Sequence, residues 1–165
     1  MVSENNSLST VAVIGAGTIG SSWAAYFLAQ GLNVRCWDPM DGYAENVTAF
    51  VARAWPLMTE LGLADGASLD NLSCHDRITE ALDGVQFVQE SGPEDAEIKA
   101  RLMAEIDRDI PEDVVISSSS TALPVSEYQH LAAHPGRIVL GHPLNPPHLM
   151  PVVEVGGGKQ TETWA

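Results

Sequence analysis

The amino-acid sequence predicts an α/β domain in which helices cover both faces of a doubly wound, mainly parallel sheet. Short apolar runs rich in β-forming residues alternate along the whole chain with segments whose apolar residues recur at helical spacing. Parallel strands need crossover connections, and such alternation supplies helices for them. A chain of 165 residues that is 45% hydrophobic can bury one core, so we expect a single domain over residues 1–165.

The first βαβ unit is clearly marked. Residues 1–8 form a polar tail, and residues 10–14 form an apolar run that stops at glycines. Apolar positions then follow helical spacing over residues 19–28, and Gly31 stands where a helix ends. Residues 32–37 supply a second β-rich run, so we predict strand, helix and parallel strand in this order.

The middle of the chain continues the alternation. A helical pattern begins at Tyr43, and Pro56 within it predicts either one broken helix or two helices. The elements expected next are a loop over 62–68, a strand over 71–75, a helical turn over 79–82 and a strand over 85–89.

The last third completes six or seven strands. The expected elements are a helix from about Glu94, a strand over 114–116, a helix over 124–132, a strand over 137–140, a Pro-rich turn over 142–147 and a strand over 152–155. Residues 156–165 begin with three glycines and look like the start of a linker or helix toward a second domain that this sequence lacks. We therefore expect the chain to be a fragment.

Composition excludes several classes of partner. Eight basic against twenty-two acidic residues give a formal net charge of −14, which disfavours nucleic acids and anionic membrane surfaces. The N-terminus lacks a signal-peptide pattern and no run of 18 apolar residues occurs, so we expect a cytoplasmic protein that binds a small-molecule substrate. Cys36 and Cys74 are expected to be reduced, and no metal site is predicted.

The segment from Gly15 to Gly20 carries the strongest functional signal. It reads G-x-G-x-x-G, directly after the first predicted strand and at the start of the first predicted helix. There, Gly15 permits a tight turn, Gly17 a close approach of phosphates and Gly20 close helix packing, while the Thr18 and Ile19 backbone lies at the positive end of the helix dipole. The motif predicts a Rossmann-like dinucleotide site.

Asp38 favours NAD over NADP as the cofactor. It lies at the end of the second predicted strand, where its carboxylate can bind the ribose hydroxyls and would repel a 2′-phosphate. The alternative is that these glycines only punctuate a βα turn and that Asp38 only caps the next segment.

His142 and Glu154 are the candidate catalytic residues. His142 follows one predicted strand and Glu154 lies in the next, so their side chains are within reach of each other. A carboxylate on an apolar strand is costly to bury unless it is paired, and an imidazole partner would gain basicity and a fixed orientation. That arrangement suits a general base, although a structural histidine and a water-facing glutamate remain the alternative.

Five ordered segments together resemble one known family. They are the glycine loop, Asp38, the segment 89–94 with Lys99, the serine-rich turn before Thr121, and G-H-P-L-N-P-P at 141–147 followed by P-V-V-E-V at 151–155. The last is similar to the H-x-x-N-P…V-E-V signature of 3-hydroxyacyl-CoA dehydrogenases. The resemblance covers nearly the whole chain.

The resemblance implies roles for these residues. His142 would take the proton of a 3-hydroxyl while hydride passes to NAD, and Glu154 would orient and balance the imidazolium. Asn145 would lie near the substrate oxygen, Glu90 near the nicotinamide ribose and Lys99 near the cofactor, with a solvated helix face as the alternative for Lys99.

The serine-rich turn departs from the family pattern. The family usually has Thr-Ser where this chain has Ser120-Thr121. Thr121 keeps a hydroxyl for the substrate, but its extra methyl restricts the rotamers, so Ser119 or Ser120 is an alternative.

Fewer residues indicate which group within this family the chain resembles, and therefore which substrate to expect. Trp55-Pro56, the loop region over 62–69 and the Pro-rich turn are more similar to carnitine dehydrogenases and to the gulonate dehydrogenase and lambda-crystallin group, which act on free 3-hydroxy acids. The resemblance implies a homodimer in the full-length form and low activity for an isolated domain. The rival hypothesis is a non-catalytic, crystallin-like NAD-binding protein.

Overall fold

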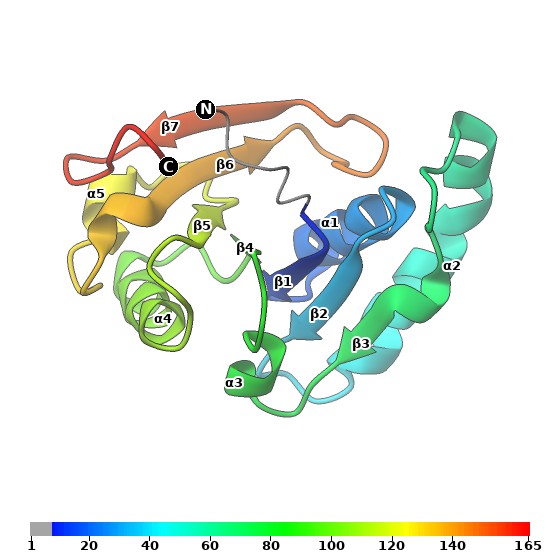
Figure 1. Ribbon diagram of the computed structural model, residues 1–165, viewed down its shortest axis with the longest axis horizontal. Coiled ribbons are helices and arrows are strands. Elements are labelled where there is room, and N and C mark those ends of the chain that lie inside the picture. Colours follow the sequence, from blue (N-terminus) through cyan, green and yellow to red (C-terminus); the bar gives the residue numbers. More distant parts are fainter. Residues whose placement is uncertain (1–7) are drawn as a thin grey trace, which may run out of the picture.

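The structure, a computed structural model that describes residues 8–165, is built on one seven-stranded sheet (Figure 1). The strand order is β3-β2-β1-β4-β5-β6-β7, and every neighbouring pair is parallel except β6 and β7. The strands are β1 (Thr10–Ile14), β2 (Asn33–Trp37), β3 (Leu72–Cys74), β4 (Phe87–Glu90), β5 (Val115–Ser118), β6 (Ile138–Pro143) and β7 (Val153–Gly157). This confirms the predicted doubly wound, mainly parallel sheet. The expected polar tail lies, apart from Leu8, outside the described residues.

Helices cover both faces of the sheet (Figure 1). In β1, Val11 and Val13 pack with α1 and α2, whereas Ala12 and Ile14 pack with α3, α4 and α5, as expected for a strand whose side chains alternate between two buried faces. The helices are α1 (Thr18–Ala29), α2 (Tyr43–Leu61), α3 (Ile78–Ala81), α4 (Ala96–Arg108) and α5 (Val125–Tyr128), with short 3₁₀ turns η1 (Leu69–Asn71) and η2 (Pro135–Arg137). Between residues 8 and 165, the structure contains no helix that is long and apolar enough to cross a membrane.

The predicted interruption at Pro56 is wrong, because α2 runs unbroken through it. Pro56 and Ala52 both lie on the exposed side of the helix, so the Ala52 carbonyl that loses its amide partner is on the side of the solvent. The opposite side, which includes Val47, Val51 and Met58, is buried and holds the helix together across the proline.

The predicted helix over 124–132 is too long, since α5 ends at Tyr128. The chain turns there because Asp107 on α4 accepts hydrogen bonds from the amides of Ala133 and His134, at 2.8 and 3.1 Å. These amides thereby find partners outside a helix, and the chain is directed through η2 into β6.

The boundaries of the last two strands also differ from prediction. β6 extends to Pro143, so His142 lies in a strand and not in the Pro-rich turn. β7 includes Gly156 and Gly157, which the sequence suggested as a linker. Residues 158–165 form turns and not a helix, because Thr161 accepts a bond from the Gly158 amide and donates one to the Ile138 carbonyl.

Cys36 and Cys74 are free thiols on neighbouring strands β2 and β3. Burial raises the pKa of both thiols. Both are reduced, as the sequence predicts; Cys36 is a buried small apolar residue of the core, and Cys74 packs against that core while partly buried.

Candidate active site

The glycine loop joins β1 to α1 at the edge of the sheet where the parallel strands end. Gly15 has a φ of +93°, and a Cβ there would come within 2.7 Å of the Ser91 carbonyl carbon. A Cβ on Gly20 would overlap the Gly15 carbonyl oxygen, so the helix packs directly on the turn. Gly17 is different: it is exposed, and a Cβ there would meet no atom of the described part of the chain within 4 Å. Gly15 and Gly20 thus serve the fold, while Gly17 leaves open space for a ligand.

The first turn of α1 has the properties of an anion site. Among residues 8–165, no side chain caps the helix at Gly17, and the first turn contains no acidic residue. Thr18 and Ile19 therefore present amides without intrahelical partners at the positive end of the helix dipole. This geometry fits the pyrophosphate that the motif predicts.

Asp38 directly follows β2 and supports the glycine loop. Its Oδ2 accepts a hydrogen bond from the Ala16 amide at 2.7 Å, and its Oδ1 accepts one from the Met40 amide at 2.9 Å. Asp38 remains partly exposed beside the loop. Asp38 thus supports the glycine turn and also caps the following segment, as the alternative interpretation of the sequence expected, while its contact with a ribose stays a prediction.

A cleft of about 720 Å³ lies beside the glycine loop and Asp38. This volume is in the range of small-molecule and cofactor sites. The lining is mostly apolar and combines the ends of β1 and β2, the loop after β4 and one side of α4, including Trp37, Met40, Pro93, Ile98 and Leu102. It adjoins the point between β1 and β4 where the strand order reverses, which is the expected place for a nucleotide in such a sheet. The residues therefore fit NAD.

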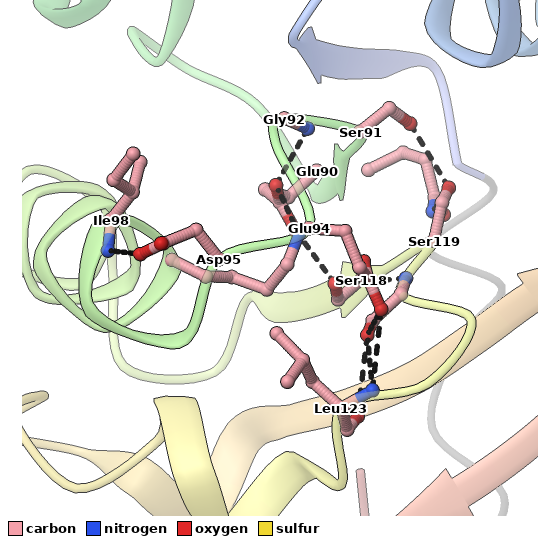
Figure 2. A network of polar contacts seen from close by, with 12 residues as sticks. Glu90, Ser91, Gly92, Glu94, Asp95, Ile98, Ser118, Ser119 and Leu123 are labelled. Carbon is pink, nitrogen blue, oxygen red and sulfur yellow. Dashed lines mark hydrogen bonds and ion pairs between the residues drawn. The ribbon is translucent and has the colours of Figure 1, made fainter.

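Glu90 and Lys99 form a buried ion pair. Lys99 Nζ lies 2.8 and 2.9 Å from the two Glu90 carboxylate oxygens, and their side chains are 1% and 0% exposed. Glu90 also accepts bonds from Ser118 Oγ and the Gly92 amide, both at 2.6 Å (Figure 2). A solvated helix face for Lys99 is thus wrong. The pair shapes the loop that lines the cleft from inside the domain, and direct contact of either residue with the cofactor stays a prediction.

Glu94 holds the serine-rich turn in place (Figure 2). Its Oε1 accepts hydrogen bonds from the amides of Thr121, Ala122 and Leu123 at 3.0, 2.8 and 3.2 Å, and from Ser120 Oγ at 2.7 Å. Burial alone would raise the pKa of Glu94, but these bonds outweigh it and lower that pKa. Sequence reasoning missed this role, because an acid beside Gly-Pro looks like a helix start and its partners lie 26 to 29 residues away.

Of the three hydroxyl residues considered for the substrate, only Thr121 is exposed. Ser120 is 1% exposed and is bonded to Glu94. Ser119 Oγ accepts bonds from Trp23 Nε1 at 3.1 Å and Gln89 Nε2 at 2.8 Å. The geometry therefore favours Thr121 over the two serines as the hydroxyl that faces the site.

His142 and Glu154 meet, as the sequence predicts. They are directly paired in the antiparallel register of β6 and β7, and His142 Nδ1 lies 2.8 Å from Glu154 Oε2. An ionised carboxylate only accepts, so Nδ1 carries the proton and Nε2 is left as a proton acceptor. The premise of a buried carboxylate is wrong, however, because β7 is an edge strand and the Glu154 side chain is 71% exposed, against 23% for His142.

Asn145 lies just beyond this pair, in the loop that joins β6 to β7. It is exposed and precedes Pro146 through a cis peptide bond. Among the described residues, no side-chain hydrogen bond places it against His142 or Glu154. Its position near a substrate oxygen stays a prediction.

Comparison with known proteins identifies the family of this chain. Residues 10–165 match the family model described as 3-hydroxyacyl-CoA dehydrogenase, NAD binding domain. The chain is 49% identical over 156 residues to an L-carnitine dehydrogenase of Nocardiopsis dassonvillei. The aligned region covers 94% of this chain and 47% of that protein. It is 43% identical over 154 residues to the L-carnitine dehydrogenase of Pseudomonas putida. This alignment covers 93% of this chain and 48% of that protein. The chain thus spans about half the length of these relatives.

Solved structures share the fold. A 5-formyl-3-hydroxy-2-methylpyridine 4-carboxylic acid 5-dehydrogenase, an NAD⁺-dependent dismutase, superimposes with a TM-score of 0.87 at 29% identity, covering 96% of this chain and 52% of that one. The 3-hydroxybutyryl-CoA dehydrogenase of Escherichia coli K12 gives a TM-score of 0.86 at 25% identity, and the superposition covers 96% of this chain and 34% of that one. The glycine loop, the reversal point and the family match lead to one conclusion: the chain belongs to the 3-hydroxyacyl-CoA dehydrogenase family and comprises its NAD-binding domain.

Proposed function

We propose that this domain is part of an NAD-dependent dehydrogenase that oxidises the 3-hydroxyl of a free 3-hydroxy acid to the ketone, with L-carnitine as the first candidate. The observation that carries the proposal is the His142–Glu154 pair, with Nδ1 and Oε2 2.8 Å apart, in the same sheet as the glycine loop. NAD, when bound, supplies the hydride acceptor.

The residues of the domain would divide the remaining work. His142 accepts the hydroxyl proton at Nε2, and the Glu154 carboxylate holds the ring and balances the imidazolium charge. Thr121 and Asn145 orient the substrate oxygen from the turn after β5 and the loop after β6. Glu90 and Lys99 keep the loop between β4 and α4 in shape beside the cofactor.

Two observations favour a free acid over a CoA thioester. The relatives at 43% and 49% identity are named L-carnitine dehydrogenases. The formal net charge of −14 also disfavours the long-range approach of a phosphate-bearing CoA more than that of zwitterionic L-carnitine.

The test is NADH formation by the full natural chain with L-carnitine, L-gulonate and 3-hydroxybutyryl-CoA, for wild type and for His142→Gln. L-carnitine should give the highest kcat/KM, and His142→Gln should lower it by about 10²- to 10⁴-fold with NAD binding retained. Equal rates for the two proteins would refute the role of His142. NAD binding without turnover of any substrate would support the crystallin-like alternative.

The oligomeric state and cellular location are separate proposals. We propose a homodimer in the full natural chain, which light scattering would test, and a cytoplasmic location, which fractionation would test. A monomer at micromolar concentration or recovery in another compartment would contradict them.

A further inference from the structure

The loop over residues 144–152 reaches from the β6–β7 pair toward α1 (Figure 1). His148, within this loop, makes two hydrogen bonds to Ser22 of α1: its Nδ1 lies 2.6 Å from Ser22 Oγ, and its amide donates to the same oxygen at 3.1 Å. Phe50 of α2 packs edge-on against the imidazole, with ring centroids 5.4 Å apart and planes at 84°. The loop is thus attached to both helices on this face of the sheet.

We assign Nδ1 of His148 as the acceptor in this contact. The Ser22 hydroxyl accepts from the His148 amide and has one proton of its own to donate. Burial lowers the pKa of His148, which favours the neutral ring whose Nδ1 can accept that proton. Ser22 is 1% exposed, so the contact also gives a partner to a polar group that is costly to bury alone.

The place of this contact links the two halves of the candidate site. Ser22 lies four residues, about one helical turn, after Thr18, in the helix whose first turn carries the glycine loop. The loop held by His148 carries Asn145 and leads into β7, whose register places Glu154 opposite His142. Within the loop, the amides of Leu149 and Met150 donate to the Pro146 carbonyl, both at 3.0 Å.

We propose that His148 is a positioning residue for the dehydrogenation described above: through Ser22 it fixes the β6–β7 loop, and with it Asn145 and the Glu154–His142 pair, relative to α1 and the cofactor loop. The inference rests on the proposed function for its effect on rate. The anchoring itself is a property of the domain and can be measured without substrate.

The experiment compares Ser22→Ala, His148→Phe and His148→Asn in the full natural chain. Phenylalanine keeps the ring contact with Phe50 but has no acceptor, whereas asparagine places its Oδ1 where histidine has Nδ1. Ser22→Ala and His148→Phe should lower kcat with L-carnitine about tenfold or more, because small displacements of catalytic groups are costly. The Kd for NAD should stay within about twofold, since the glycine loop is untouched. His148→Asn should restore most of kcat.

Hydrogen exchange gives the readout that does not depend on activity. The amides of Leu149 and Met150 should exchange faster in Ser22→Ala and His148→Phe, and at the wild-type rate in His148→Asn. The Ser22→Ala/His148→Phe double variant should be no worse than Ser22→Ala alone, because Ser22→Ala already removes the hydrogen bond to the ring that His148→Phe removes. His130→Phe, an exposed histidine beyond α5, is the matched control and should change nothing.

Each outcome decides the proposal. Unchanged exchange in Ser22→Ala would overturn the anchor, and faster exchange with unchanged kcat would overturn the positioning role. Failure of His148→Asn to restore kcat or the amide exchange rates would contradict the assignment of His148 Nδ1 as the acceptor that holds the loop. A wild-type protein without turnover would overturn the proposed function, and the exchange rates would still decide whether His148 anchors the loop.

Discussion

The domain contains two pairs, each of a glutamate with a basic side chain, that have the same length but opposite surroundings. Lys99 and Glu90 approach to 2.8 Å with side chains 1% and 0% exposed, whereas His142 and Glu154 approach to 2.8 Å with side chains 23% and 71% exposed. The first pair joins α4 to the end of β4 and takes further bonds from Ser118 and the Gly92 amide (Figure 2). The second lies on the β6–β7 pair at one end of the sheet, whereas β4 is its central strand.

The difference separates stability from chemistry. Removing one partner of a buried pair leaves an uncompensated charge inside the protein, which is strongly destabilising. An exposed pair contributes little to folding but keeps its charge accessible to a substrate. We therefore expect the Glu90–Lys99 pair to be needed for folding and the His142–Glu154 pair to be needed for turnover.

The largest expected effect is on the buried pair. Lys99→Met should lower the free energy of unfolding by about 3–5 kcal/mol, because Glu90 would be left charged and buried. Urea unfolding of the purified domain measures this. The matched control is Arg101→Met on the same helix, whose pair with Glu97 is exposed on both sides and should cost less than about 1 kcal/mol. Equal losses for the two variants would contradict the comparison.

Acid should reveal a second buried pair. Burial alone would raise the pKa of Asp107, but the bonds and charge of Arg137 and the amides of His134 and Ala133 outweigh it and lower that pKa. The folded state then binds fewer protons than the unfolded state around the usual carboxyl range, about pH 4. Its contribution to stability is present above that range and is lost as the pH falls through the lowered pKa. The Asp107→Asn variant should have a lower free energy of unfolding at neutral pH, and that free energy should fall less steeply as the pH is lowered. Chemical unfolding at a series of pH values measures this, and the same dependence on pH as in the wild type would contradict it.

A smaller effect is expected at the turn that carries Thr121. Glu94→Gln removes the charge that four donors share, and should cost about 1 kcal/mol while raising the KM for the substrate. Chemical unfolding and initial rates check both. Glu97→Gln, an exposed acid one turn away, is the control and should leave both quantities unchanged.

The sequence predicted the sheet and the nucleotide loop well because both depend on local patterns. The helical spacing after Gly15–Gly20 and the alternating apolar runs act within short windows, and the structure follows them. Pro56 misled the prediction, because only the tertiary fold shows that it lies on the exposed side of α2. The short α5 likewise depends on Asp107, a residue of another helix.

The candidate site was predicted only in part, because only part of it depends on local sequence patterns. The His142–Glu154 pairing follows from two consecutive strands, but the exposure of Glu154 depends on the edge position of β7. Glu94 and His148 were missed because their partners, Ser120 and Ser22, lie 26 and 126 residues away. Contacts of that range leave no pattern in a single sequence.

The most direct test of the account is the rate of NADH formation by Glu154→Gln with NAD and L-carnitine. Glutamine keeps the shape of the side chain and an oxygen for the Nδ1 proton but removes the charge, and its folding cost at this exposed position should stay below about 1 kcal/mol. We predict a kcat about 10²-fold lower or more, because the imidazolium formed at His142 loses its counter-charge. A Glu154→Gln protein with the wild-type rate would contradict the assignment of this pair as the catalytic centre.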